Sequence, residues 1–471
     1  MSDAMPPPAD AGEGRRAPRV RGRAVAVVLL ALAVIASGVA LDRVGARPAS
    51  SAPAGPFSGA WFCPHGGGPG WHGWVSITNP GGAPASVRVT SFGSQGPGTP
   101  RTFTVAPGAQ LYRPVDASDR GSTTEVEYFG AWVGAGSVVE SPGSAVAAAR
   151  CVDAPHPTWL MPDESTGKGE TAYLVVMNPF GVPAEFSVTL RTERRSIHPG
   201  SLTPEVLGPG RSEAIEIDRY VLEGPGERTV TAQVVSQLGR VVAGSLVVSS
   251  GAARAAAGLP APASRWYIPA GGYGSPAGLV VVNPGSQPAV LSGTTVAQGD
   301  LATLGPSAGT TLTGNRAVTI PAVGTLGGGI ILKARGHATV GAAFQVTGPT
   351  GDAAAITGAS DTAMSWLVPP SVPDSGGSST IVLLNPGSKA ARVRIRLLGE
   401  SGEVLSSFGV IDVPAGREAL VPVSVAGTVP VAAVATAAGG GIVAGGFATS
   451  GAGAGYAATV GLPIPAPRPA P

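Results

Sequence analysis

The strongest constraint on this chain is an internal repeat of about one hundred residues. A tryptophan, two apolar residues and a proline recur as WFCP at 61–64, WLMP at 159–162, WYIP at 266–269 and WLVP at 366–369, with tryptophan spacings of 98, 107 and 100 residues. An apolar stretch ending in Asn-Pro follows 17 to 19 residues after each tryptophan, and its asparagines are 99, 105 and 102 residues apart. Because two independent markers keep one period, the sequence predicts four repeated units.

Each unit has the residue pattern of short β-strands. Stretches such as ASVRVTSF at 85–92 and ARVRIRLL at 391–398 alternate apolar and polar residues, which is typical of a strand with one buried face. A Pro/Gly turn follows about thirty residues after the repeat asparagine in three units, and the best match in the third unit is TIPAVGTL at 319–326. About seven or eight strands per ~100 residues is the rhythm of an immunoglobulin-like sandwich.

We therefore expect an all-β protein made of four tandem immunoglobulin-like β-sandwich repeats after one N-terminal transmembrane helix. The predicted repeats cover 61–150, 151–255, 256–356 and 357–463. The alternative is that the four units close into a ring or propeller-like assembly, because the segment before each repeat tryptophan recurs at the chain's end as YAATVGLPIPAP. In that case the C-terminal strand would meet the first unit. A length of ~100 residues is long for a propeller blade, which favours sandwich repeats.

The N-terminal region has the composition of a membrane anchor. An Arg-rich tail at 1–23, expected to be disordered, precedes eighteen uncharged residues at 24–41, and a Pro/Ala/Ser linker follows at 42–60. Eighteen helical residues span about 27 Å, close to the thickness of a bilayer core. The positive charge before this segment predicts a single-pass plasma-membrane protein with a cytoplasmic N-terminus and an extracytoplasmic bulk. Secretion after signal-peptide cleavage near Ala40 is the alternative. A Pro-rich tail at 464–471 ends the chain.

The charge distribution argues against nucleic acid as a partner. The net charge is +2, and residues 1–23 alone carry that excess, which leaves 26 basic against 26 acidic residues in the rest of the chain. A protein that binds the phosphate backbone needs a concentrated basic surface. We therefore expect no nucleic-acid binding, and the membrane is the one partner that the sequence indicates directly, through residues 24–41.

The recurring Asn-Pro steps have the chemistry of structural turns. Proline ends a sheet ladder and holds the preceding residue extended, while asparagine can satisfy nearby backbone groups through its side chain. Where Gly follows, Pro-Gly suits the centre of a type II turn, in which Gly takes a positive φ. We expect turn formation rather than ligand binding from the eight repeat-turn residues: Asn79, Pro80, Asn178, Pro179, Asn283, Pro284, Asn385 and Pro386.

The repeat tryptophans also have a structural interpretation. Aromatic side chains on β-surfaces can stack on sugars, but one tryptophan per unit at a fixed place more often fills the core or the joint between units. We expect packing roles for Trp61, Trp159, Trp266 and Trp366.

Only two cysteines are present, Cys63 and Cys151. An even number in an exported protein favours a disulfide, and this one would join the two ends of the first unit. The alternative is zinc, held by these cysteines with His65, His72 and His156, but their spacing matches no standard zinc motif. We therefore expect a disulfide, no metal site and no cofactor.

The stretch HGGGPGWH at 65–72 has no counterpart in the other units. Loops at the ends of sandwiches commonly carry binding function. Trp71, His65 and His72 are therefore the candidate contact residues of the chain.

Three other patterns carry little weight as catalytic motifs. GPSAG at 305–309 matches the form of a nucleophile elbow but lacks the helix that must follow it, and STGKGET at 165–171 lacks the upstream glycine of a phosphate loop. The neighbouring acids Asp163/Glu164 and Glu125/Glu127 have no recurring partners, so we expect them on a solvated face.

The ordered set of Trp-x-x-Pro, Asn-Pro-Gly, VPAG and VVAG motifs over residues 57–465 resembles an uncharacterised actinobacterial family of membrane-anchored or secreted proteins, known only as a domain of unknown function. The resemblance implies a cell-envelope protein and supplies no catalytic residues. We expect a non-enzymatic scaffold or binding protein, whose candidate partners are a cell-wall glycan or another envelope protein. The alternative is a protein that binds or processes wall glycans through the loop around Trp71.

Overall fold

The computed structural model describes thirteen stretches of the chain. They are 57–165, 167, 169–221, 229–271, 277–296, 301–304, 309–321, 328–348, 352–372, 377–404, 408–423, 430–451 and 455–465. The predicted tail at 1–23, the predicted membrane helix at 24–41, nearly all of the linker at 42–60 and residues 466–471 lie outside them, as do residues 305–308 of the GPSAG match. Among the described residues, no helix has the length and hydrophobicity needed to cross a membrane.

The compact unit Gly55–Pro471 is all-β and β-sandwich-like, as predicted. Its described residues form eight antiparallel sheets, arranged along the chain as four sheet pairs at 58–150, 158–257, 265–357 and 365–463. The only helical elements in the described stretches are two 3-10 turns in the second pair, η1 (Gly200–Leu202) and η2 (Ile217–Arg219).

In the first sheet pair, one sheet has the order β1-β7-β3-β4, with β5 also on β3, and the other has the order β6-β2-β8-β9. Its strands are β1 (Ser58–Cys63), β2 (His72–Asn79), β3 (Ala85–Gly93), β4 (Gly96–Pro97), β5 (Arg101–Val105), β6 (Ala109–Val115), β7 (Thr123–Phe129), β8 (Gly134–Glu140) and β9 (Val146–Arg150). The second pair has the same order, as β10-β16-β12-β13 with β14, and β15-β11-β17-β18. Its strands are β10 (Thr158–Ser165), β11 (Glu170–Asn178), β12 (Ala184–Arg191), β13 (Ser196–Ile197), β14 (Glu205–Leu207), β15 (Arg211–Glu216), β16 (Thr229–Leu238), β17 (Val242–Ser249) and β18 (Ala252–Ala257).

The third pair repeats the order as β19-β25-β21-β22 with β23, and β24-β20-β26-β27. Its strands are β19 (Arg265–Ile268), β20 (Ala277–Asn283), β21 (Ala289–Val296), β22 (Leu301–Leu304), β23 (Thr310–Leu312), β24 (Arg316–Pro321), β25 (Gly329–Ala334), β26 (Gly341–Thr347) and β27 (Ala353–Thr357). The fourth pair has β37-β28-β34-β30-β31 with β32, and β33-β29-β35-β36. Its strands are β28 (Ser365–Val368), β29 (Ser379–Asn385), β30 (Ala391–Gly399), β31 (Gly402–Val404), β32 (Ile411–Val413), β33 (Arg417–Val423), β34 (Ala432–Ala438), β35 (Val443–Thr449), β36 (Tyr456–Val460) and β37 (Leu462–Pro463).

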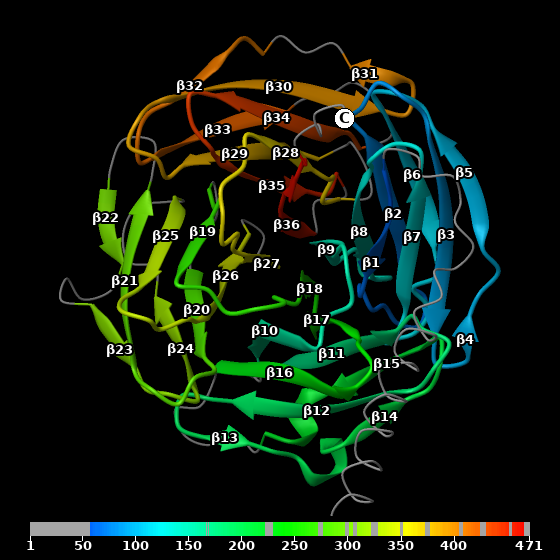
Figure 1. Ribbon diagram of the computed structural model, residues 1–471, viewed down its shortest axis with the longest axis vertical. Helices are drawn as coiled ribbons and strands as arrows, with labels where there is room; N and C mark the ends of the chain where they lie inside the picture. The colour runs from blue at the N-terminus through cyan, green and yellow to red at the C-terminus, as the bar shows by residue number, and fades with distance from the viewer. Residues whose placement is uncertain are drawn as a thin grey trace, which may run out of the picture. The chain divides into compact units, whose positions relative to one another are not determined.

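The last long strand of each sheet pair lies at the centre of this unit, where β9, β18, β27 and β36 pack against one another (Figure 1). The contact between β36 and β9 brings the fourth pair against the first. These strands are rich in alanine, as in VAAAR and AARAAA, and such small side chains let backbones approach closely. We call them the axial strands.

The C-terminal strand lies at the junction of the fourth and first pairs. Its backbone pairs with β28 of its own sheet pair. The link is made by side chains, because Leu462 and Leu367 share a buried cluster with Cys63 and Val133 of the first pair.

Candidate functional site

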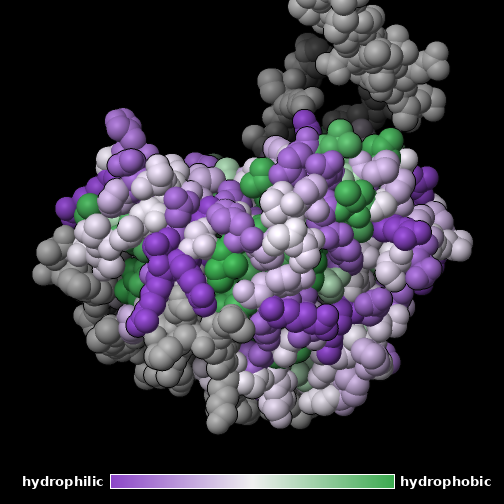
Figure 2. All heavy atoms as spheres, turned by 90° about the horizontal axis from the view of Figure 1, so that it is seen from below, coloured by the Kyte–Doolittle hydropathy of each residue, from purple (hydrophilic) through white to green (hydrophobic). Residues whose placement is uncertain are grey.

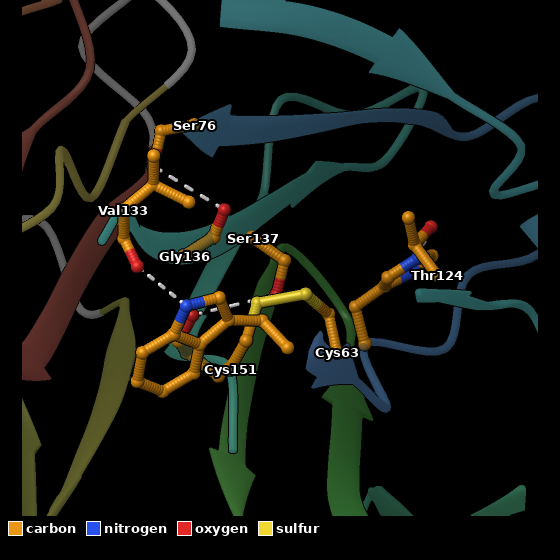
Figure 3. Close-up of a disulfide and its surroundings, with 10 residues drawn as sticks. Cys63, Ser76, Thr124, Val133, Gly136, Ser137 and Cys151 are labelled. Carbon is orange, nitrogen blue, oxygen red and sulfur yellow. Dashed lines mark hydrogen bonds between the residues drawn. A yellow bond between two sulfur atoms is a disulfide. The ribbon is translucent and has the colours of Figure 1, made fainter. Parts of the chain in front are cut away.

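The two cysteines form a disulfide between the first strand of the first sheet pair and the segment that follows its last strand (Figure 3). Cys63 and Cys151 are 88 residues apart in sequence, their Cα atoms are 4.4 Å apart, and both are buried. The predicted disulfide is therefore confirmed, and it leaves no free thiol for a metal among the described residues. No group of three or more His, Cys, Asp or Glu side chains that could hold a metal occurs in the described stretches.

The backbone pairing next to the disulfide recurs in the second sheet pair, where Leu160 pairs with Leu259 as Phe62 pairs with Val152 in the first. In this register, Met161 and Gly258 occupy the positions of the two cysteines. A Cβ atom on Gly258 would lie 3.1 Å from the Met161 sulfur. The third and fourth pairs likewise combine a larger apolar residue with a glycine. A large side chain next to a glycine thus fills the space that the disulfide fills in the first pair.

The four repeat tryptophans make the same contact in every sheet pair. Each is at most 6% exposed and donates its indole N–H to a backbone carbonyl at 2.6 or 2.7 Å. The donor–acceptor pairs are Trp61–Val133 (its carbonyl is seen in Figure 3), Trp159–Val241, Trp266–Val340 and Trp366–Ile442. Buried and fully hydrogen-bonded, these rings are placed to pack rather than to stack on a sugar.

The four repeat asparagines are equally uniform. Each is buried, and its side-chain oxygen accepts the N–H of the residue two positions later, which is Gly81, Phe180, Gly285 or Gly387. Each side-chain amide also donates to the carbonyl four positions later and to a second carbonyl about 28 residues along the chain. These side chains are Asx-turn formers that tie two loops together, and they have no free donor directed at a ligand.

The predicted type II turn is wrong. Gly81, Gly285 and Gly387 all lack the positive φ that this turn requires. The asparagine oxygen captures the glycine N–H instead, so the turn closes through the side chain. A Cβ on these glycines would lie 3.0 to 3.3 Å from that oxygen. This crowding explains why glycine is favoured here even though the backbone is not left-handed.

The Pro/Gly turn predicted about thirty residues after each repeat asparagine lies at Asn315 in the third unit. The match predicted at 319–326 is therefore wrong. Gly108, Gly210 and Gly416 have φ between 60° and 64°, and Asn315 has φ of 55°. The N–H of Asn315 binds the Gly285 carbonyl at 2.8 Å, as the corresponding glycines do in the other pairs. Asparagine is the non-glycine residue that best tolerates this conformation, and it conceals the repeat in the sequence.

His65 does not fit a surface contact role, because it is only 1% exposed. Its Nδ1 lies 2.7 Å from the Gly66 carbonyl and its Nε2 lies 2.9 Å from the Thr124 hydroxyl. Burial lowers the pKa of His65 to about 4, so the ring is neutral at pH 7 and Nε2 accepts from the hydroxyl. The run of glycines lets this loop approach its neighbours, since a Cβ on Gly67 would lie 2.1 Å from the Ala117 carbonyl oxygen.

Trp71 is half-buried at the junction with the second sheet pair. The Arg120 guanidinium lies 5.2 Å from the Trp71 ring centroid and 5.1 Å from that of Tyr173 on β11. This stack joins two sheet pairs through cation–π contacts and covers one face of the indole. His72 is exposed and lies near Trp74, at 6.1 Å between ring centroids.

Asp163 and Glu164 are fully buried, so the prediction of a solvated face is wrong for them. The register of β10 on β16 shifts between Met161 and Glu164, and this bulge interrupts the in-and-out alternation of the strand. Arg254 binds Asp163 at 3.2 Å and Glu170 at 2.6 Å.

Gln345 of the third sheet pair also donates to Asp163, at 2.7 Å, so this ionic cluster spans the joint between the second and third pairs. Burial raises the pKa of Asp163, while the charge of Arg254 opposes that effect. Glu164 has no hydrogen bond to either carboxylate oxygen from the described residues, and burial raises its pKa well above the usual range. Glu164 is fully enclosed and cannot reach a substrate, whereas Arg254, Glu170 and Gln345 of the ionic cluster line a cavity of about 360 Å³.

One cavity lies between the first and fourth sheet pairs and has a volume of about 660 Å³. Its walls include Phe57, Trp132, Met364, Arg396 and Ile464, and they are mainly apolar. We call this the seam cavity. The other large exposed apolar side chains are scattered, and the face in Figure 2 shows small apolar groups among polar residues.

No protein-family model matches the chain, and no curated protein is similar to it in sequence. The resemblance to the uncharacterised envelope family therefore stays a prediction.

Proposed function

We propose that this chain is a non-enzymatic, membrane-anchored binding protein of the bacterial cell envelope, with four immunoglobulin-like units closed into a ring. The observation that carries the proposal is the packing of β36 on β9, which makes the first and last sheet pairs neighbours; the seam cavity lies between the same two pairs. A large apolar cavity with few polar groups is the usual form of a binding site.

The disulfide supports the extracytoplasmic location. Structural disulfides form and persist in oxidising compartments and are rare in the cytosol. The apolar segment at 24–41, with arginines before it, supports anchoring with this orientation. The resemblance to envelope proteins supports the same compartment.

Topology can be tested in whole cells with a tag at each end of the chain. Protease added outside should remove the C-terminal tag and spare the N-terminal one. In denatured samples, a maleimide reagent should label the buried Cys63 and Cys151 only after reduction. Retention of the C-terminal tag, or labelling without a reductant, would contradict an extracytoplasmic disulfide protein.

The binding role can be tested with a photo-crosslinking amino acid at Met364, which lines the seam cavity and is 49% exposed. Leu238 on the second sheet pair is 59% exposed and supplies the matched control. We expect a discrete adduct from position 364 and none from position 238. Equal adducts from both positions, or none from either, would remove the seam cavity as the binding site.

Glycan binding through the opening loop is the second candidate. The repeat tryptophans are buried, and Arg120 covers one face of Trp71, so sugar stacking lacks a freely exposed ring at these positions. A glycan array on wild type and Trp71→Ala tests it directly. Saturable glycan binding that is lost in Trp71→Ala would replace the proposal with this candidate.

A further inference from the structure

One of the four axial strands ends in a charged residue. The axial strands end at Arg150, Ala257, Thr357 and Val460. These four positions are equivalent, because two residues later in each sheet pair a residue pairs with the one that follows the repeat tryptophan. The last three of these are 2 to 4% exposed. A guanidinium therefore occupies a place that small or apolar side chains occupy in the other three sheet pairs.

The Arg150 guanidinium has no hydrogen bond or ion pair with the residues that the structure describes, and its Nε is buried without a partner. Asp153 contributes only a longer-range charge, and burial lowers the pKa of Arg150. Arg254, the axial arginine of the second pair, instead binds two carboxylates. Arg150 is partly exposed, and its terminal nitrogens are not among the buried atoms that lack a partner. A guanidinium whose Nε is buried and unpaired and whose terminal nitrogens are accessible is placed to receive a ligand.

Two cavities adjoin at Arg150, with volumes of about 260 and 300 Å³. They share Arg150, Pro260 and Pro463, and we call them together the axial site. All four repeat tryptophans line it: Trp61 and Trp159 in one cavity, Trp266 and Trp366 in the other. The site thus has one strong cation, an apolar wall of tryptophan and proline, and contributions from all four sheet pairs.

We infer that the axial site binds a small ligand with an apolar body and a carboxylate group, and that the Arg150 guanidinium holds that carboxylate. The planar guanidinium fork matches a carboxylate in charge and in hydrogen-bond geometry. Asp153 and Asp361 also line the cavities and are negatively charged, which favours a singly charged carboxylate over a doubly charged phosphate. The inference rests on the proposed ring, since all four units form the site.

An internal pairing of Arg150 with Asp153 is the competing explanation. It predicts that Asp153→Asn destabilises the folded protein, because the replacement leaves the arginine without its only compensating charge. The ligand site predicts the opposite effect on binding: Asp153→Asn removes a repelling charge and strengthens carboxylate binding.

The test uses calorimetric titration of the full-length protein in detergent with benzoate, with benzyl alcohol as the uncharged analogue and inorganic phosphate as the dianion. We expect saturable benzoate binding, about 10- to 100-fold weaker in Arg150→Met, and no measurable binding of benzyl alcohol. Arg150→Met should fold, because the equivalent positions hold Ala, Thr and Val. Its unfolding midpoint without ligand should be no lower than that of the wild type, since a partly buried charge without an ion-pair partner is removed.

Equal benzoate affinity in wild type and Arg150→Met would overturn the inference, as would a complete absence of benzoate binding. Tighter binding of phosphate than of benzoate would overturn the assignment of the ligand as a carboxylate. A lower midpoint for Arg150→Met, with no benzoate binding, would identify the Asp153 pairing as the role of the arginine. None of these results alters the crosslinking or topology outcomes, so failure of the axial site is distinguishable from failure of the proposed function.

Discussion

Replacing Glu418 with glutamine should stabilise the protein at alkaline pH and leave it unchanged at acid pH. Glu418 lies on β33, is 2% exposed, and accepts the Gly329 N–H of the third sheet pair at 2.5 Å. Its other carboxylate oxygen is buried and has no hydrogen-bond partner in the part of the chain that the structure describes. Burial raises its pKa from 4.5 to about 8, and the Gly329 hydrogen bond opposes that shift only in part.

The sign and size of the effect follow from proton linkage. Between pH 4.5 and 8 the folded protein holds a proton on Glu418 that the unfolded chain has lost, so the free energy of unfolding falls as the pH rises through this window. At about 1.36 kcal/mol for each pH unit, the loss reaches about 5 kcal/mol at pH 8. A glutamine keeps an oxygen that can accept the Gly329 N–H and has no charge to desolvate.

The assay is urea unfolding of wild type and Glu418→Gln at pH steps from 4 to 9, with the difference in the free energy of unfolding plotted against pH. The two proteins should agree at pH 4, and the variant should be more stable by up to about 5 kcal/mol at pH 8. Glu403→Gln, which breaks an exposed ion pair with Arg396, should shift stability by less than about 1 kcal/mol. A difference between wild type and Glu418→Gln that does not change with pH would refute the reasoning.

Three further predictions concern the repeated contacts. The Cys63–Cys151 bond closes an 88-residue separation, which corresponds to about 4.6 kcal/mol of chain entropy, so replacing both residues by alanine should lower the urea midpoint strongly. The C63M/C151G pair of the second unit should recover part of that loss. Trp159→Phe removes the indole hydrogen bond to the Val241 carbonyl, which still accepts the His156 N–H, and should cost about 0.5–1.5 kcal/mol in urea unfolding; an unchanged midpoint would contradict a stabilising role for this hydrogen bond. Asn315→Ala should cost about 1–2 kcal/mol because φ is 55°, whereas Asn315→Gly should be close to neutral in thermal denaturation; equal losses would contradict the left-handed assignment.

The repeat, the all-β class and the disulfide could be read from the sequence because each depends on local pattern or residue count. The burial of Asp163 and Glu164 could not, because it depends on a one-strand bulge that no local pattern marks. Asn315 was hidden because it takes the conformation that glycine takes in the other units.

The role of the opening loop also depends on long-range packing. Trp71 lies against Arg120, which in turn lies against Tyr173 of the next sheet pair, more than one hundred residues further along the chain. The sequence around Arg150 contains no motif that marks it as a binding residue. Its lack of a hydrogen-bond partner becomes visible only where the four axial strands pack together. Both features are products of the arrangement of the units.

The central claim is that the units close on themselves, and small-angle X-ray scattering of residues 55–471 tests it most directly. A compact chain of this length has a radius of gyration of about 22 Å, whereas four sandwiches in a row would give about 40 Å. We predict a value near 22 Å that is independent of protein concentration. A value near 40 Å would contradict the packing of β36 on β9, and with it the seam cavity and the axial site.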